Sequence, residues 1–133
     1  MNDHQVSVAK ACIHGAEENT MTFPQVIGQL ADAGFEGYAI DFRRAIATYY
    51  LPTGESVELA THKTGVPVAA AFDAAQIQAA IKDAQTLAAG YTYKGFCKKV
   101  AAAGCAGYIV SFSGRRALYI GRTAEAHVEH FPS

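Results

Sequence analysis

Apolar residues recur at helical spacing in four stretches of the chain and alternate with polar residues in the stretches that follow. The helical spacing predicts helices from about residue 3 to Gly15, 23–33, 73–89 and 93–103. After each second helix the period changes to two, as in Tyr38, Ile40 and Phe42, which is typical of a half-buried strand. Two further strands are expected after each of these, at 45–51 and 56–60 and at 116–121 and 126–131.

Polar residues that cap helices mark where these helices begin. Asn2 with Gln5, Thr22 with Gln25, and Asp73 with Gln76 have the spacing of capping boxes, and Thr92 is a further capping residue. Gly34 and Gly104 follow the second and fourth helices, where a left-handed residue commonly ends a helix.

The two halves of the chain resemble each other. Comparing residues 21–59 with 91–129, a shift of 70 positions, gives 11 identities in 39 pairs, including Gly34/Gly104, Tyr38/Tyr108 and Tyr49/Tyr119. We interpret this as an internal duplication of a helix-helix-strand-strand-strand unit, with pseudo-repeats at about 1–60 and 72–133 and a connector at 61–71. The fold class predicted is α+β, a single domain at 1–133 in which one antiparallel sheet from both repeats is covered by about four helices.

The side of this sheet that faces away from the helices is expected to differ between the halves. In the second half it carries four aliphatic residues, Ile109, Leu118, Ile120 and Val128. Such a cluster exceeds the usual scatter of apolar residues on a monomer surface, so we expect a homodimer that buries it. The alternative is a different sheet tilt that buries the cluster within one chain.

Composition narrows the function classes. The chain has 133 residues and a formal net charge of −1, which predicts no nucleic-acid or membrane partner. Its three cysteines form no CxxC pair, and the N-terminus lacks the pattern of a signal peptide. We therefore expect a soluble, cytoplasmic protein without disulfides.

Residues that differ between the two halves are candidates for a functional site. Val57 and Leu59 of the first half correspond to His127 and Glu129 of the second, which share one strand face while His130 points the other way. Such a pair could hold a metal, act as an acid–base pair, contact a polar ligand, or be an ordinary polar edge strand.

Two residues of the first half complete the candidate ligand-binding set. They are Asp41, which could instead pair with Arg43, and Tyr50. No catalytic residue, metal ligand set or cofactor motif is predicted.

Four segments carry a resemblance that covers most of the chain: FPQVIGQLADAGFEGY, TYY, AAGCAGY and the closing HVEHFP. In this order and spacing they resemble the YbcV-like family of small bacterial proteins of unknown function, some of which carry the label "phage envelope protein". The resemblance implies a soluble single domain of a prophage-associated kind. It implies no activity, cofactor or catalytic residue.

Two functional hypotheses remain open. The first is a non-enzymatic ligand-binding or protein-interaction module, dimeric, which uses the sheet and its C-terminal strand. The second is a small hydrolase-like or metal-assisted enzyme in which His127 and Glu129 do the acid–base work.

Overall fold

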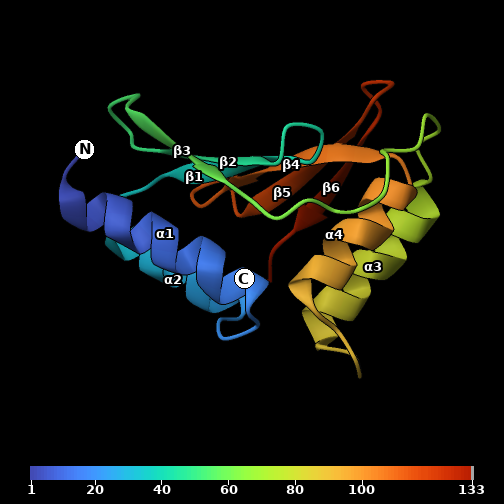
Figure 1. Ribbon diagram of the computed structural model, residues 1–133, viewed down its shortest axis with the longest axis horizontal. Helices are drawn as coiled ribbons and strands as arrows, with labels where there is room; N and C mark the ends of the chain where they lie inside the picture. The colour runs from blue at the N-terminus through green and yellow to red at the C-terminus, as the bar shows by residue number, and fades with distance from the viewer. Residues whose placement is uncertain (133) are drawn as a thin grey trace.

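The computed structural model describes residues 1–132, in which four helices and six strands follow one another in the order α-α-β-β-β, twice (Figure 1). The elements of the first half are α1 (Asp3–Glu17), α2 (Phe23–Asp32), β1 (Gly37–Asp41), β2 (Ile46–Tyr50) and β3 (Ser56–Ala60). Those of the second half are α3 (Ala74–Thr86), α4 (Tyr93–Ala102), β4 (Cys105–Ser111), β5 (Arg116–Gly121) and β6 (Ala126–His130).

The six strands form one antiparallel sheet in the order β3-β2-β1-β4-β5-β6 within residues 1–132. The predicted α+β class is therefore confirmed. Among the strands of residues 1–132, the two halves pair through β1 and β4 at the centre of the sheet. In that pairing Ala39 lies opposite Ile109, its own counterpart at the shift of 70, as a two-fold relation between the halves requires.

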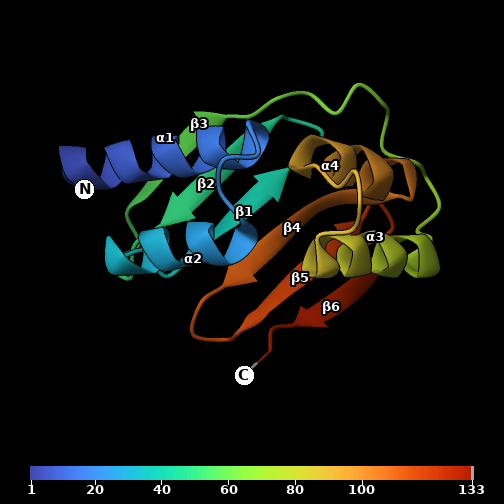
Figure 2. The ribbon, with the colours of Figure 1, turned by 90° about the horizontal axis from the view of Figure 1, so that it is seen from below.

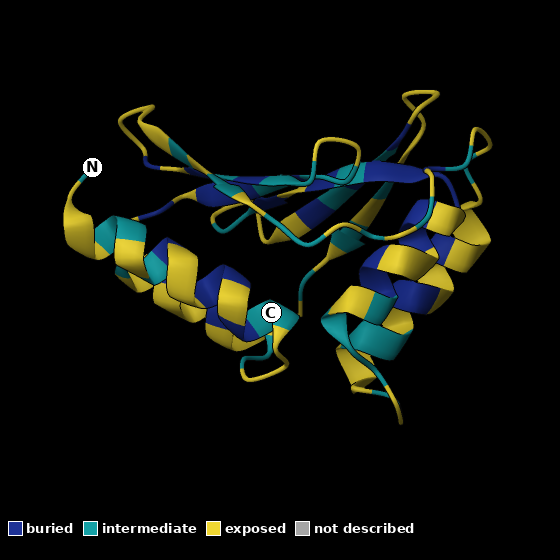
Figure 3. Cartoon of the chain, in the orientation of Figure 1, coloured by how far each residue is buried: buried dark blue, intermediate teal, exposed yellow. Residues whose placement is uncertain are grey.

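Both helix pairs lie under the same face of the sheet, α1 with α2 on one side and α3 with α4 on the other (Figures 1 and 2). Their buried sides face the strands, and the outer sides of the helices are exposed (Figure 3). The core between the layers contains apolar residues of both halves, such as Leu30, Ile77, Val100 and Val110.

Local signals placed the helix starts correctly. Asn2 and Thr22 each form a complete capping box, and Asp73 and Thr92 each accept a hydrogen bond from the backbone N–H three residues on. The ends differ from the prediction. The first helix continues two residues past Gly15 to Glu17, and the third stops at Thr86 because Leu87 adopts a left-handed conformation.

Left-handed residues recur at equivalent places in the two halves. Positive φ angles occur at three pairs separated by 70 positions: Gly34/Gly104, Ala45/Arg115 and Gly54/Ala124. Ala45 and Arg115 lie in the β1–β2 and β4–β5 turns, and neither of these left-handed positions is occupied by glycine. Equivalent turns therefore share a backbone conformation despite different residues.

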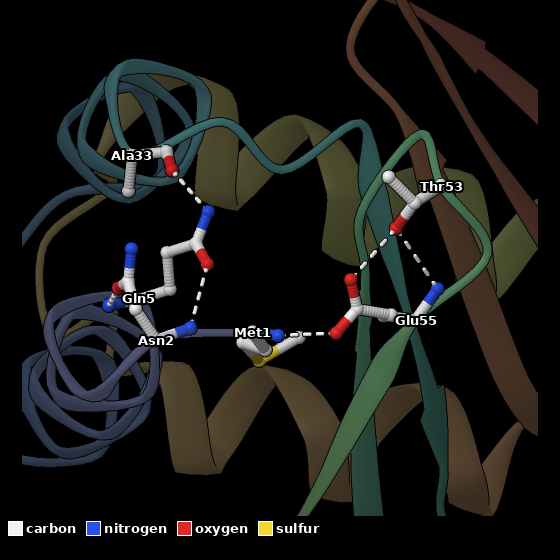
Figure 4. A network of polar contacts seen from close by, with 6 residues as sticks. All are labelled: Met1, Asn2, Gln5, Ala33, Thr53 and Glu55. Atoms are coloured by element: carbon white, nitrogen blue, oxygen red, sulfur yellow. Dashed lines mark hydrogen bonds and ion pairs between the residues drawn. The ribbon is translucent and has the colours of Figure 1, made fainter.

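A polar network ties the start of α1 to its surroundings (Figure 4). The Gln5 side-chain amide donates to the carbonyl of Ala33 at the end of α2, at 3.0 Å. The amino group of Met1 contacts the carboxylate of Glu55 in the β2–β3 turn, which also accepts from Thr53. These contacts hold α1 against both its partner helix and its own part of the sheet.

The outer face of the sheet is apolar in one half and more polar in the other. Cross-strand pairing places one row of side chains side by side, and from β3 to β6 these are Glu58, Thr48, Ala39, Ile109, Leu118 and Val128. Ile109 and Val128 are among the exposed large apolar residues. In the predicted aliphatic cluster, Ile109 and Val128 are therefore exposed in the single chain, while Leu118 and Ile120 are half-buried.

The glycines that end α2 and α4 allow a matched stability test. Gly34 and Gly104 have φ of 101° and 99°, so a side chain is strained at both. A Cβ on Gly34 would only touch the Gln5 amide, whereas a Cβ on Gly104 would overlap the carbonyl of Ala71. We expect Gly34→Ala to lower the free energy of unfolding by about 1–2 kcal/mol, and Gly104→Ala by about 3 kcal/mol or more.

Urea denaturation of the two variants measures the difference. Equal losses would contradict the close packing of residue 104 against the segment that precedes α3.

Candidate functional site

A cavity of about 530 Å³ lies between the two helix pairs and the inner face of the sheet. Both halves line it. The first contributes residues from α1, the α1–α2 loop, α2, β1 and β2, and the second from α3, α4, β4, β5 and β6. The floor is formed by buried residues such as Tyr38 and Tyr108, while Phe23 and Leu87 at its margin are exposed. The cavity is therefore reached from the side between the helix pairs.

Tyrosines dominate its lining. Six of the seven tyrosines of the chain face this cavity, and Tyr50 is the exception: they are Tyr38, Tyr49, Tyr91, Tyr93, Tyr108 and Tyr119. Four come from the inner face of the sheet, at equivalent positions of the two halves. Their rings pack at tilted or edge-to-face angles, with Tyr38 and Tyr49 at 5.4 Å and Tyr108 and Tyr119 at 5.2 Å between centroids.

The tyrosine hydroxyls make this apolar cavity partly polar. The hydroxyls of Tyr93 and Tyr108 are hydrogen-bonded to each other at 2.8 Å. Burial raises the pKa of Tyr38, Tyr93, Tyr108 and Tyr119 well above the usual value for a phenol. These groups are therefore neutral hydroxyls near pH 7 and can both donate and accept hydrogen bonds.

Glu129 is the one charged residue that lines the cavity in the described part of the chain. It is half-buried on β6. Its Oε1 accepts a hydrogen bond from the Tyr119 hydroxyl at 2.9 Å, and its Oε2 accepts one from the Gln85 amide of α3 at 2.8 Å. Two neutral donors from different elements thus fix the orientation of the carboxylate.

The three cysteines are free and buried. Burial raises the pKa of Cys12 to about 11, of Cys97 to about 12 and of Cys105 to about 11. Because the thiolate is the nucleophilic form, these protonated thiols are poorly suited to nucleophilic catalysis near neutral pH.

The structure brings only one of the five sequence-predicted site residues to the cavity. Glu129 lines it, and His127 is half-buried two residues earlier on the same strand, without contributing to the lining. His130 is exposed at the end of β6.

The two candidates of the first half lie elsewhere. The Asp41 carboxylate accepts hydrogen bonds from the backbone N–H groups of Arg43 and Arg44, which shapes the β1–β2 turn. Tyr50 is 41% exposed on the outer face of the sheet. Three strands stand between the strands of Tyr50 and His130, so the predicted set does not form one cluster.

The residues that sequence reasoning missed are the cavity tyrosines and Gln85. A signal was present, because tyrosine rather than an aliphatic residue occupies helix-facing strand positions at 38, 49, 108 and 119. A purely structural core would favour residues without a polar atom at such positions.

The described residues contain neither a group of three metal ligands nor a membrane-spanning helix. Within residues 1–132, no group of three histidine, cysteine, aspartate or glutamate side chains is placed to hold a metal ion. None of the helices in that range has the length and apolar character needed to cross a bilayer.

A family comparison covers most of this architecture. Residues 10–128 match the family described as "Protein of unknown function (DUF1398)". The chain belongs to this family. The match begins within α1 and ends within β6, and it includes all the residues that line the cavity except Glu129 and Pro132. A search of curated proteins found no match.

Proposed function

We propose that the chain is a non-enzymatic binding protein for a small, largely apolar molecule. The observation that carries this proposal is the cavity of about 530 Å³ between the helix pairs and the sheet. Ligand sites in proteins commonly have volumes of roughly 300–1,000 Å³, with mostly apolar walls and a few polar groups that orient the ligand. The tyrosine hydroxyls and Glu129 are such groups here.

Ligand binding also accounts for the tyrosine-lined cavity better than the packing of a protein core does. A protein core normally packs without large voids, and tyrosine hydroxyls are costly to bury without partners. Here the two halves leave a cleft at the point where they meet, and hydroxyl-bearing rings face it from both sides. A ligand would cover apolar ring surface that now faces the cleft.

The enzyme alternative rests on His127 and Glu129 and has less support. No hydrogen bond joins these two side chains within the described residues, and Glu129 is instead held by Tyr119 and Gln85. An acid–base pair requires its members within hydrogen-bond reach of each other or of a shared substrate atom. Measurable hydrolysis that is lost in both His127→Ala and Glu129→Gln would favour this alternative.

As a protein partner we propose a second copy of the chain. The support is the aliphatic row of exposed Ile109, half-buried Leu118 and exposed Val128, which continues from the centre of the sheet to its edge strand. A two-fold dimer would place this row against its own copy and remove it from water.

We also propose that the chain is related to the YbcV-like bacterial proteins, that it has a prophage-associated origin, and that it has a cytoplasmic location. The last is supported by three buried, unpaired thiols, which a reducing compartment preserves.

Filling the cavity tests the binding proposal. Ala16 on α1 and Ala84 on α3 line it from opposite sides, whereas Ala79 on α3 is exposed and outside the lining. The probe is N-phenyl-1-naphthylamine, a neutral dye whose fluorescence rises in apolar surroundings. We expect the wild-type chain to bind it, and Ala16→Trp and Ala84→Trp each to weaken binding at least about tenfold, because the indole occupies the ligand's space.

Ala79→Trp is the matched control and should bind like the wild type. Thermal unfolding confirms that each variant folds. The proposal would be refuted if the wild type did not bind the dye, or if neither Ala16→Trp nor Ala84→Trp weakened dye binding.

The dimer proposal predicts a mass of about twice 14.1 kDa by light scattering at micromolar concentration. Ile109→Lys and Val128→Lys should shift the chain toward the monomer, because a charge cannot be buried in an apolar interface without a partner. Thr48→Lys, in the same row of the more polar half, should leave the mass unchanged. A wild-type monomer would contradict the proposal.

A further inference from the structure

The charge of Glu129 has no cationic partner in the described part of the chain. Its hydrogen-bond partners are the hydroxyl of Tyr119 and the amide of Gln85, which are both neutral. The cavity lining contains no lysine, arginine or histidine within residues 1–132. A carboxylate has about four acceptor positions, so two hydrogen bonds leave acceptor capacity for a further donor.

A second carboxylate of the molecule, that of Glu17, does have a partner that can carry a positive charge. Glu17, at the end of α1, accepts hydrogen bonds from the backbone N–H of His62 at 2.8 Å and contacts its ring Nδ1 at 2.9 Å. That side chain is also mostly buried, and its partner can carry a positive charge. Glu17 therefore joins α1 to the connector, while Glu129 in the cavity has no such partner.

An aromatic residue contacts the carboxylate directly. It is Tyr119, whose ring packs against Phe96 and Tyr108 at centroid distances of 6.2 and 5.2 Å. Tyr91 also lines the cavity, and burial first, then Cys97 and Glu129, raise its pKa to about 12. Aromatic faces attract cations, and more strongly where water is excluded.

The equivalent position of the first half has no charge. Glu129 corresponds to Leu59, and the two occupy the same register opposite Ala117 and Ala47. An aliphatic residue therefore fits this place in the fold, and the glutamate is not required by packing.

From these observations we propose that the cavity selects amphipathic organic cations, with an amine or ammonium head at Glu129 and an apolar body between the helix pairs. This inference rests on the proposed binding function and specifies its ligand class. A cationic head would form a charge-assisted hydrogen bond with the carboxylate, in a cavity whose lining contains aromatic rings that attract cations. An anionic head would face an unpaired carboxylate and be rejected.

Three probes that share an apolar phenylbutyl body and differ in the charge of their head group test whether the cavity selects cations. They are 4-phenylbutylamine, 4-phenylbutanol and 4-phenylbutyrate, each used at pH 7 to displace N-phenyl-1-naphthylamine. We expect the amine to bind about tenfold more tightly than the alcohol, and the carboxylate to bind most weakly. Calorimetry of the amine confirms a direct interaction.

Variants at residue 129 separate charge from shape. Glu129→Gln keeps the size of the side chain, and Glu129→Leu installs the residue of the first half as a second variant that the fold accommodates. In both, the amine should lose its advantage over the alcohol, while the affinity for the alcohol changes less than about threefold. Tyr119→Phe removes one donor to the carboxylate and keeps its charge, so the preference for the amine should persist.

The outcomes distinguish this inference from the function on which it rests. If the dye binds but the three heads displace it equally, or the carboxylate or alcohol is preferred, or no head displaces it, cation selection is wrong and the binding function stands. A preference for the amine that survives both Glu129 variants also overturns the inference. If neither the dye nor any probe binds the wild type, the proposed function itself fails.

Discussion

The pairing of β1 with β4 is the constraint on which the rest of the structure depends. It is the one strand pairing between the two halves, within the residues described, and its register sets Ala39 against Ile109. Because all six strands lie in one sheet, both helix pairs are brought under a single face. The cavity forms between these pairs, so it is a consequence of how the halves join rather than a property of either half.

The cavity lining differs between the two halves at the position of Glu129, although the helices and strands around it follow the same order in both. Tyr38 and Tyr108, and Tyr49 and Tyr119, occupy equivalent inner positions and give the cavity matching aromatic walls. Glu129 breaks the match, since its counterpart is aliphatic. The walls alone would accept a range of apolar molecules, and in the function we propose the single charge of Glu129 orients the ligand and selects its head group.

Much of the fold could be predicted from the sequence, because local chemistry marked its elements. Capping residues such as Thr22 and glycines such as Gly34 act within a few residues of themselves, so their effects appear in the sequence. The site was harder to predict. Whether an inner-face tyrosine completes a solid core or faces a cavity depends on how far apart the helix pairs settle, which is a tertiary property. Comparing the halves selects Glu129, which lines the cavity, whereas Asp41 accepts hydrogen bonds within the β1–β2 turn.

The central claim is that the tyrosine-lined cavity is where this chain binds its ligand. Nuclear magnetic resonance with ring-labelled tyrosine tests it most directly, since six tyrosines face the cavity and Tyr50 lies on the outer face of the sheet. Titration with 4-phenylbutylamine should shift the ring signals of Tyr91, Tyr108 and Tyr119 and leave that of Tyr50 unmoved. Shifts confined to Tyr50, or equal across all seven rings, would contradict the account.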